Sequence, residues 1–296
     1  MNLKIQKYCG LAYIDKVTEL MLSIRAKDKY AGLYEAADLQ WWWSLDRFNN
    51  IDDPDRLLFW LDDEEKPLAV LVLYEGKNRW DHEFMYLPDI NNIAKKRICW
   101  NVLEIINSFK TSKPIYTVVH EHDREWRSML ESNGWHYANQ DMVQMEQKST
   151  YIPEVPSLPE GMYFHDETQR NSKLYQHHLC KRGPEAIAER LKQCSLYRPD
   201  LDLAIKTNDA LVAAYCVCWV DQQNNIGIFE PVRTEDKFQK RGLGSALLME
   251  GIRRMNRLGA TSIKISHEFE NAAAKALYTK VGFQTKFLKI RLIRTI

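Results

Sequence analysis

The chain lacks several features that would assign it to a class at once. Only 6 of its 296 residues are cysteines, and no two of them form a Cys-x-x-Cys pair. Nowhere do 18 apolar residues follow one another, and closely spaced lysines interrupt the N-terminal stretch where a signal peptide would need an apolar run. We therefore expect reduced thiols, no membrane association and a cytoplasmic location.

An excess of charge of one sign is also missing. The chain has 41 basic and 40 acidic side chains and a formal net charge of +1. Because nucleic-acid binding usually requires a basic excess, this balance argues against a nucleic-acid partner. Hydrophobic residues make up 45% of the chain and charged residues 27%, which is typical of a soluble globular protein.

No pattern of metal ligands stands out. Cys216 and Cys218 lie in the alternating run LVAAYCVCWV, where both face one side of a strand. His177 and His178 would point to different faces of a helix, and we expect both at the surface. The sequence therefore predicts no metal site.

Three prolines mark the middle of the chain. Pro153, Pro156 and Pro159 lie in KSTYIPEVPSLPEG and favour an extended path. We predict a linker over 150–160 between a first domain, 1–149, and a second domain, 161–296.

The second half mixes strands and helices. Strands are predicted at 162–165, 201–206, 211–220, 226–232 and 262–266. Helices are predicted near 169–181 and 184–194, from the glycines at 242 and 244 to 259, and at 271–280, before a closing hairpin or strand pair. This order predicts an α/β fold of mixed α+β character with a partly antiparallel sheet.

The first half repeats this order. Strands at 57–61, 68–74 and 80–86 precede the helical run KKRICWNVLEII, the strand IYTVVHE and a helix that ends at SNGW. Placing Arg97 on Arg241 gives an offset of 241 − 97 = 144, and placing Gly134 on Gly282 gives 282 − 134 = 148. Two matches in the same order with similar offsets predict a tandem duplication.

The stretch QKRGLGSALL, 239–248, places two glycines at the start of a predicted helix. A dinucleotide-binding fingerprint would need a third small residue where Leu247 stands, and a Walker motif would need Gly-Lys-Ser/Thr. A third interpretation is a pyrophosphate cradle of helix N-terminal N–H groups with basic residues beside them. The turn by itself supports a second interpretation equally well, namely a tight corner before a helix whose basic residues are solvated.

A second motif decides between these interpretations. Together with ENAAAKALYTKVGF, 270–283, the glycine stretch resembles the Gcn5-related N-acetyltransferase (GNAT) superfamily. Gln239, Gly242 and Gly244 match its loop pattern Arg/Gln-x-x-Gly-x-Gly/Ala. The helix pattern Asn-x-x-Ala-x-x-Leu-Tyr-x-x-x-Gly-Phe is matched by Asn271, Ala274, Leu277, Tyr278, Gly282 and Phe283. The resemblance is specific over 201–287, extends over 161–296, and is weak in the first half.

The resemblance implies two tandem acyl-CoA N-acyltransferase folds, acetyl-CoA as co-substrate and no metal. It implies that the strand end at Val232, Arg233 and Thr234 pairs with the pantetheine amides. The pyrophosphate would lie against Gln239, Lys240, Arg241, Gly242, Leu243, Gly244 and Ser245. Asn271 would contact the pantetheine arm, cap its own helix, or do both.

Two residues are candidates for acid–base chemistry. By the resemblance, Tyr278 would protonate the departing thiolate; the alternative is a core tyrosine. Strand alternation puts Glu230 on an apolar face with Ile228 and Val232, where an acid is costly unless it is partnered or functional. Glu230 is therefore either the general base for the incoming amine or a structural glutamate paired with an arginine such as Arg233. N–H groups near Val232 would stabilise the oxyanion.

The first half has lost the matching residues. Ile98 and Trp100 stand where the two glycines would be, and both would fill the space that phosphates require. Asp123 and Leu130 stand at the places of the asparagine and tyrosine of the second motif. We therefore predict a degenerate GNAT-like first domain that binds no acyl-CoA and helps to shape the acceptor cleft.

The cluster QWWWSL, 40–45, belongs to this half. Trp41, Trp42 and Trp43 cannot share one helix face, so we expect at least one at the surface or at an interface. Domain packing is the favoured role, and a ring-stacking platform is the alternative.

The sequence thus predicts an acetyl-CoA-dependent N-acetyltransferase with its active site in the C-terminal domain. It would transfer acetyl directly to an amine of a small molecule or peptide, as a monomer or homodimer. The alternative is a non-catalytic acyl-CoA-binding or sensor protein, and a ligand-free pair of structural domains is a third option. The acceptor itself is not specified.

Overall fold

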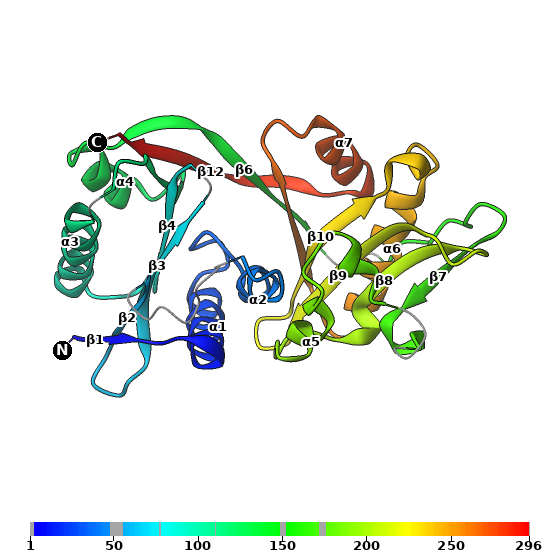
Figure 1. The fold of residues 1–296 in the computed structure, drawn as a ribbon, viewed down its shortest axis with the longest axis horizontal. Helices are drawn as coiled ribbons and strands as arrows, with labels where there is room; N and C mark the ends of the chain where they lie inside the picture. Colours follow the sequence, from blue (N-terminus) through cyan, green and yellow to red (C-terminus); the bar gives the residue numbers. More distant parts are fainter. Residues whose placement is uncertain are drawn as a thin grey trace. The chain divides into compact units, whose positions relative to one another are not determined.

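The computed structural model describes residues 3–47, 56–76, 78–109, 111–148, 152–171 and 176–295. These residues form two compact units (Figure 1). The first contains 1–39, 46–142 and 287–296, and the second contains 40–45 and 143–286. None of the helices in these described ranges is both long and apolar enough to cross a bilayer.

The units differ from the expected domains at their edges. Residues 152–160 of the predicted linker form no helix or strand, but they group with the second unit. Residues 40–45 also belong to the second unit, whereas 287–296 belong to the first. The last segment joins the first unit because Lys289–Arg294 pair antiparallel with Ile115–His120. Strand pairing over a long sequence separation, which no local signal reports, therefore moves the boundary.

The first unit has a mixed sheet in the order β1 (Lys4–Lys7), β2 (Leu57–Leu61), β3 (Pro67–Glu75), β4 (Trp80–Tyr86), β5 (Ile115–His120) and β12 (Gln284–Arg294). Strands β2, β3 and β4 are antiparallel, whereas β4 and β5 are parallel. Its helices are α1 (Gly10–Lys27), the start of α2 (Ala36–Ser44), α3 (Asn92–Ser108) and α4 (Arg124–Glu131). Figure 1 shows α1 and α3 on opposite faces of this sheet.

The second unit has the order β7 (Met162–Asp166), β8 (Asp202–Thr207), β9 (Val212–Asp221), β10 (Ile226–Thr234) and β11 (Ser262–Glu268), followed by the part of β6 (His136–Lys148) that begins at Val143. Strands β7 to β10 are antiparallel neighbours, whereas β10 and β11 are parallel. Its helices are α5 (Ile187–Lys192), α6 (Leu243–Arg257) and α7 (Ala272–Val281), with short 3₁₀ helices η2 (Glu167–Gln169) and η3 (His178–Lys181).

The two units share the same topology. In each, a run of antiparallel strands is followed by a helix that leads to a parallel strand: β2–β3–β4–α3–β5 in the first and β8–β9–β10–α6–β11 in the second. The predicted α/β fold with a partly antiparallel sheet, written twice, is therefore confirmed.

Helix α6 shows why the second unit folds this way. Its buried stripe includes Leu247, Leu248, Ile252 and Met255, spaced to face one side of a helix. Gly251 allows close approach to the sheet, because a Cβ there would lie 2.5 Å from the Phe229 ring. The helix therefore packs tightly on β10, and its first turn is held at the end of that strand.

Two predicted elements are wrong. The helix expected at 169–181 is absent from the residues described there, which form only the short helices η2 and η3. The side chain of His177 accepts a hydrogen bond from the Leu179 N–H and so starts a new turn at that point. The closing hairpin is instead the single strand β12, whose pairing with β5 depends on residues far away in sequence.

Candidate acyl-transfer site

A cavity of about 700 Å³ opens in the second unit between β10, the turn before α6, and α7. Its walls include every predicted cofactor-binding residue except Arg241, together with the predicted catalytic Tyr278. Those residues are Val232, Arg233, Thr234, Gln239, Lys240, Gly242, Leu243, Gly244, Ser245 and Asn271. The structure thus brings together side chains that the sequence separates by more than forty positions.

The cavity exists because β10 diverges from β11 several residues before the end of β10. Strand β10 pairs with β11 only as far as Phe229, opposite Ile265, but pairs with β9 as far as Thr234. A register shift between Phe229 and Val232 marks a bulge, and the Trp219 indole N–H donates a 2.7 Å hydrogen bond to the Glu230 carbonyl there. Beyond Phe229 the β11-facing edge of β10 has no strand partner among the described residues.

The turn before α6 has the backbone of an anion-binding loop. Lys240 and Gly242 have positive φ values of 62° and 79°. The first hydrogen bond of the helix runs from the Ala246 N–H to the Gly242 carbonyl at 3.0 Å. The N–H groups of Leu243, Gly244 and Ser245 therefore precede the helical ladder, and the helix dipole adds partial positive charge to them. An anion is the group that this end of α6 favours.

Asn271 is the N-cap of α7. Its Oδ1 accepts a 2.9 Å hydrogen bond from the Ala274 N–H, as the capping interpretation requires. The cap uses only the oxygen, so the side-chain NH₂ of this cavity-lining residue stays available as a donor to a ligand.

Tyr278 projects from α7 and is only 6% exposed. Burial raises the pKa of its hydroxyl above the ordinary value, with further contributions from the Glu230 and Cys216 charges. The phenol is therefore protonated near neutral pH and can donate a proton or a hydrogen bond into the cavity.

Glu230 is half-buried at the bulge and does not line the cavity. Because the bulge adds a residue, the strict alternation that placed Glu230 on one face with Val232 does not hold across it. Arg233, its suggested structural partner, forms ion pairs with Glu235 and Asp236, each at 3.5 Å.

A buried cluster that the sequence did not reveal lies elsewhere in the second unit. His177 and His178 are not surface residues: they are 4% and 8% exposed, and their rings stack with centroids 4.6 Å apart. His177 Nε2 lies 3.0 Å from an Asp202 carboxylate oxygen, and His178 lies 3.0 Å from both Glu167 and Asp202. Tertiary contacts between segments far apart in sequence bury these residues, which a local helix pattern could not indicate.

The opposite charges in this cluster stabilise each other. Burial opposes the positive charge of His178, but the Asp202 and Glu167 carboxylates outweigh it and raise its pKa to about 9. Burial likewise opposes the Asp202 carboxylate, yet the histidines lower its pKa. The ligand atoms of Glu167, His177 and His178 lie within 4.8 Å of one another, a spacing a metal could use. However, His177 Nδ1 accepts the Leu179 N–H, which leaves Nε2 as the protonated donor toward Asp202.

The three tryptophans of the cluster at 40–45 are buried. Trp41, Trp42 and Trp43 are between 6% and 8% exposed, so none of the three rings lies at the surface, and of the two expected alternatives the surface position is wrong. The Trp43 indole N–H donates to the Gln193 side chain at 3.0 Å, and the Arg190 guanidinium lies 4.4 Å from the Trp43 ring centre. These contacts favour a packing role over a ring-stacking platform for ligands.

The first unit has no glycine turn at the matching place. By the offset of 144, a copy of α6 would start at 243 − 144 = 99, but α3 already starts at Asn92. Ile98 is buried and Trp100 is 52% exposed, so the helix itself, and not the Trp100 ring, takes the place of the turn. Asp123 caps α4 as Asn271 caps α7, and Leu130 is fully buried where the tyrosine would be.

Comparison with protein families matches residues 165–283 to the Acetyltransferase (GNAT) family. This part of the chain belongs to that family. A tandem GNAT protein from the clavulanic acid biosynthesis pathway is 12% identical, with 99% of this chain and 98% of that chain covered and a TM-score of 0.65. A GCN5-related N-acetyltransferase from Sphaerobacter thermophilus is 14% identical, with coverage of 99% and 95% and a TM-score of 0.62.

A GNAT-family acetyltransferase from Colwellia psychrerythraea is 10% identical, with coverage of 98% and 99% and a TM-score of 0.57. No curated protein matches the chain. At these identities the similarity concerns the fold, and it extends over both units. The GNAT fold therefore occurs twice in the chain, and the glycine turn at 239–245 lies in the second copy.

Proposed function

We propose that the second unit is an acetyl-CoA-dependent N-acetyltransferase that transfers acetyl directly to an amine of a small molecule or peptide. GNAT membership supports acyl transfer. The observation that carries the finer proposal is the single cavity that joins an unpaired strand edge, a helix N-terminus and a buried, protonated tyrosine.

The residues that line the cavity support acetyl-CoA as its ligand. The α6 N-terminus, with Lys240 and Arg241 beside it, would hold the pyrophosphate, and the edge from Val232 to Thr234 would pair with the pantetheine amides. A Cβ at Gly244 would lie 3.0 Å from the Leu277 side chain and 3.4 Å from the Thr234 hydroxyl, so a small residue suits this wall of the cavity. When bound, acetyl-CoA supplies an acetyl group activated as a thioester.

The reaction follows from these positions. The amine nitrogen bonds to the thioester carbonyl carbon, the C–S bond breaks, and its electron pair goes to sulfur, which takes a proton from Tyr278. N–H groups near Val232 would bind the oxyanion; Pro231 contributes none, so the first donor after Glu230 is the Val232 N–H. The charge on the attacking nitrogen is removed as a proton, either by Glu230 or through water.

Glu230 is the proposed base because its charge acts on Tyr278 while its carboxylate is only half-buried. A carboxylate in this position can pass a proton to water after taking it from the amine. We expect Glu230→Gln to lower kcat/KM most at low pH, where less free amine is present. An unchanged rate at neutral pH would remove Glu230 as the base.

Transfer is tested by measuring release of free coenzyme A thiol with a panel of amines that includes a polyamine, an amino acid and a peptide N-terminus. Release with at least one amine supports the enzyme. Binding of acetyl-CoA with no release on any amine would favour an acyl-CoA sensor. We further propose a cytoplasmic monomer or homodimer that needs no metal, and a first unit that binds no acyl-CoA.

A further inference from the structure

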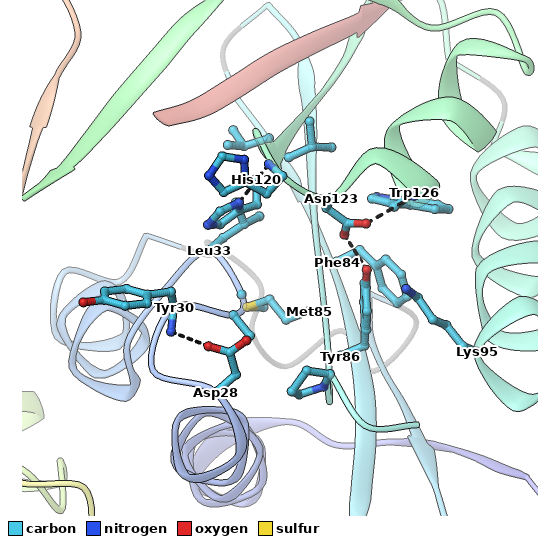
Figure 2. Close-up of a pocket in the computed structure, with 16 residues that line it drawn as sticks. Asp28, Tyr30, Leu33, Phe84, Met85, Tyr86, Lys95, His120, Asp123 and Trp126 are labelled. Carbon is cyan, nitrogen blue, oxygen red and sulfur yellow. Dashed lines mark hydrogen bonds between the residues drawn. The ribbon is translucent and has the colours of Figure 1, made fainter. Parts of the chain in front are cut away.

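The first unit contains a cavity of its own, with a volume of about 280 Å³ (Figure 2). It lies where β4 and β5 diverge: these strands pair only over Trp80–His82 and Ile115–Thr117. The later residues of both strands line the cavity, and the segment that follows α1 closes one side. The larger cavity of the second unit opens at the equivalent divergence of β10 from β11.

The walls of this cavity are mainly apolar and aromatic. Leu33, Phe84, Met85, Val119 and Trp126 are all buried and all line it. The volume is near the lower end for small-molecule pockets, which begin at roughly 300 Å³. The cavity therefore suits a compact ligand with an apolar or aromatic body.

The charge at one side of the cavity is negative. The Asp28 carboxylate accepts a 2.8 Å hydrogen bond from the Tyr30 N–H through Oδ1. Within the described ranges no cation forms an ion pair with it, although its neighbour Lys27 pairs with Asp89 at 2.8 Å. Asp28 is exposed to solvent and lines the cavity together with residues 30–33 of the closing segment, so its charge lies at the open side of the cavity, where a bound group would meet it.

The other ionisable side chains of the cavity do not offset this charge. Lys95 pairs with Glu125 at 2.9 Å, lies 4.9 Å from the Tyr86 ring centre, and is on the side of the cavity away from Asp28 in Figure 2. Burial, then the neighbouring His122, lowers the pKa of His120 to about 4, so it is neutral at pH 7. Asp123 adds a further negative charge, and it is engaged by the Tyr86 hydroxyl and the Trp126 N–H.

We propose that this cavity binds a small organic cation, an ammonium group beside Asp28 joined to an apolar or aromatic body. The aromatic walls add cation–π attraction for such a ligand, and an anion of the same shape would meet two carboxylates. The proposal concerns binding in the first unit and does not depend on acyl transfer in the second.

The test compares two probes of similar shape and opposite charge, 2-phenylethylammonium and 3-phenylpropionate, by isothermal titration calorimetry with the full chain. We expect the ammonium to bind and the carboxylate to bind at least about 10-fold more weakly. Asp28→Asn keeps the oxygen that the Tyr30 N–H needs but removes the charge, and should weaken ammonium binding by about 10-fold or more. Asp89→Asn, which removes a half-exposed carboxylate outside the cavity, should leave the affinity unchanged.

A second variant tests the location without changing charge. Ala31 lines the cavity from the closing segment, and Ala31→Phe should fill part of the space and weaken the ammonium probe by a similar factor. The proposal is overturned if neither probe binds, if the carboxylate binds more tightly than the ammonium, or if both Asp28→Asn and Ala31→Phe bind the ammonium like the wild type.

Discussion

Gly244 on α6 and Leu277 on α7 approach so closely that a Cβ added to Gly244 would lie 3.0 Å from the Leu277 Cδ2 atom. The same Cβ would lie 3.4 Å from the Thr234 hydroxyl oxygen. The second glycine of the turn before α6 thus packs against α7 and against the end of β10. The turn before α6, helix α7 and the end of β10 therefore meet at Gly244.

Gly244→Ala should destabilise the fold by about 1 kcal/mol and weaken acetyl-CoA binding, because the new methyl group pushes the Leu277 side chain out of place. Leu277→Ala removes the opposing methyl groups and should rescue part of the binding in the double variant. Urea denaturation and calorimetry of the four proteins in this cycle measure both effects. If the effects of the two substitutions are strictly additive, the contact between residues 244 and 277 contributes neither to stability nor to acetyl-CoA binding.

Gly242→Ala should cost about 1–3 kcal/mol of unfolding free energy, because its φ of +79° is unfavourable for a residue with a side chain. No atom lies within 4 Å of the added Cβ, so the cost is conformational and not a clash. Gly242→Asn should cost clearly less, since asparagine tolerates this region. Equal costs for both substitutions, measured by urea denaturation, would argue against this reason.

Tyr278→Phe should lower kcat by about 100-fold or more while changing the Kd of acetyl-CoA by less than about 3-fold, because it removes only the proton donor. Tyr163→Phe, on β7 and 41% exposed, is the matched control and should behave as the wild type. The measurement is coenzyme A release with the best amine of the panel. A Tyr278→Phe variant with full activity would assign the hydroxyl to packing.

The His178 cluster should make stability depend on pH. Because the folded pKa of about 9 exceeds the ordinary value of 6.5, the stabilisation is fully present below about pH 6.5 and is lost as pH rises through 9. The loss is of the order of 3 kcal/mol. Urea denaturation between pH 6 and 9.5 should show this decline, and His122→Gln, which replaces a 72% exposed histidine, should keep it. A stability that rises over this interval would contradict the charge assignment.

Much of the fold could be predicted because its signals are local. The alternating run LVAAYCVCWV predicted β9, and the motif glycines predicted the start of α6 and the end of α7. The cavity residues could be named together because the two motifs carry a known spacing. The sequence could not indicate that a bulge at Glu230 would break the alternation on which its role was argued.

The remaining features depend on contacts between distant segments. The His177 pair is buried by Asp202 and Glu167, and the Trp43 ring by Gln193 and Arg190. The end of the C-terminal strand β12 belongs to the first unit because it pairs with β5. The cavity of the first unit arises from the divergence of two strands, for which the sequence carries no motif.

The most direct measurement of the central claim is the stoichiometry of acetyl-CoA binding by calorimetry in charge-reversed variants. Lys240→Glu/Arg241→Glu alters the turn before α6, and Lys96→Glu/Arg97→Glu alters the exposed positions 144 residues earlier. We predict one acetyl-CoA per chain, an affinity at least about 10-fold weaker in the first variant, and wild-type affinity in the second. Two molecules per chain, no binding at all, or a loss of affinity only in the Lys96→Glu/Arg97→Glu variant would contradict a single acyl-CoA site in the second unit.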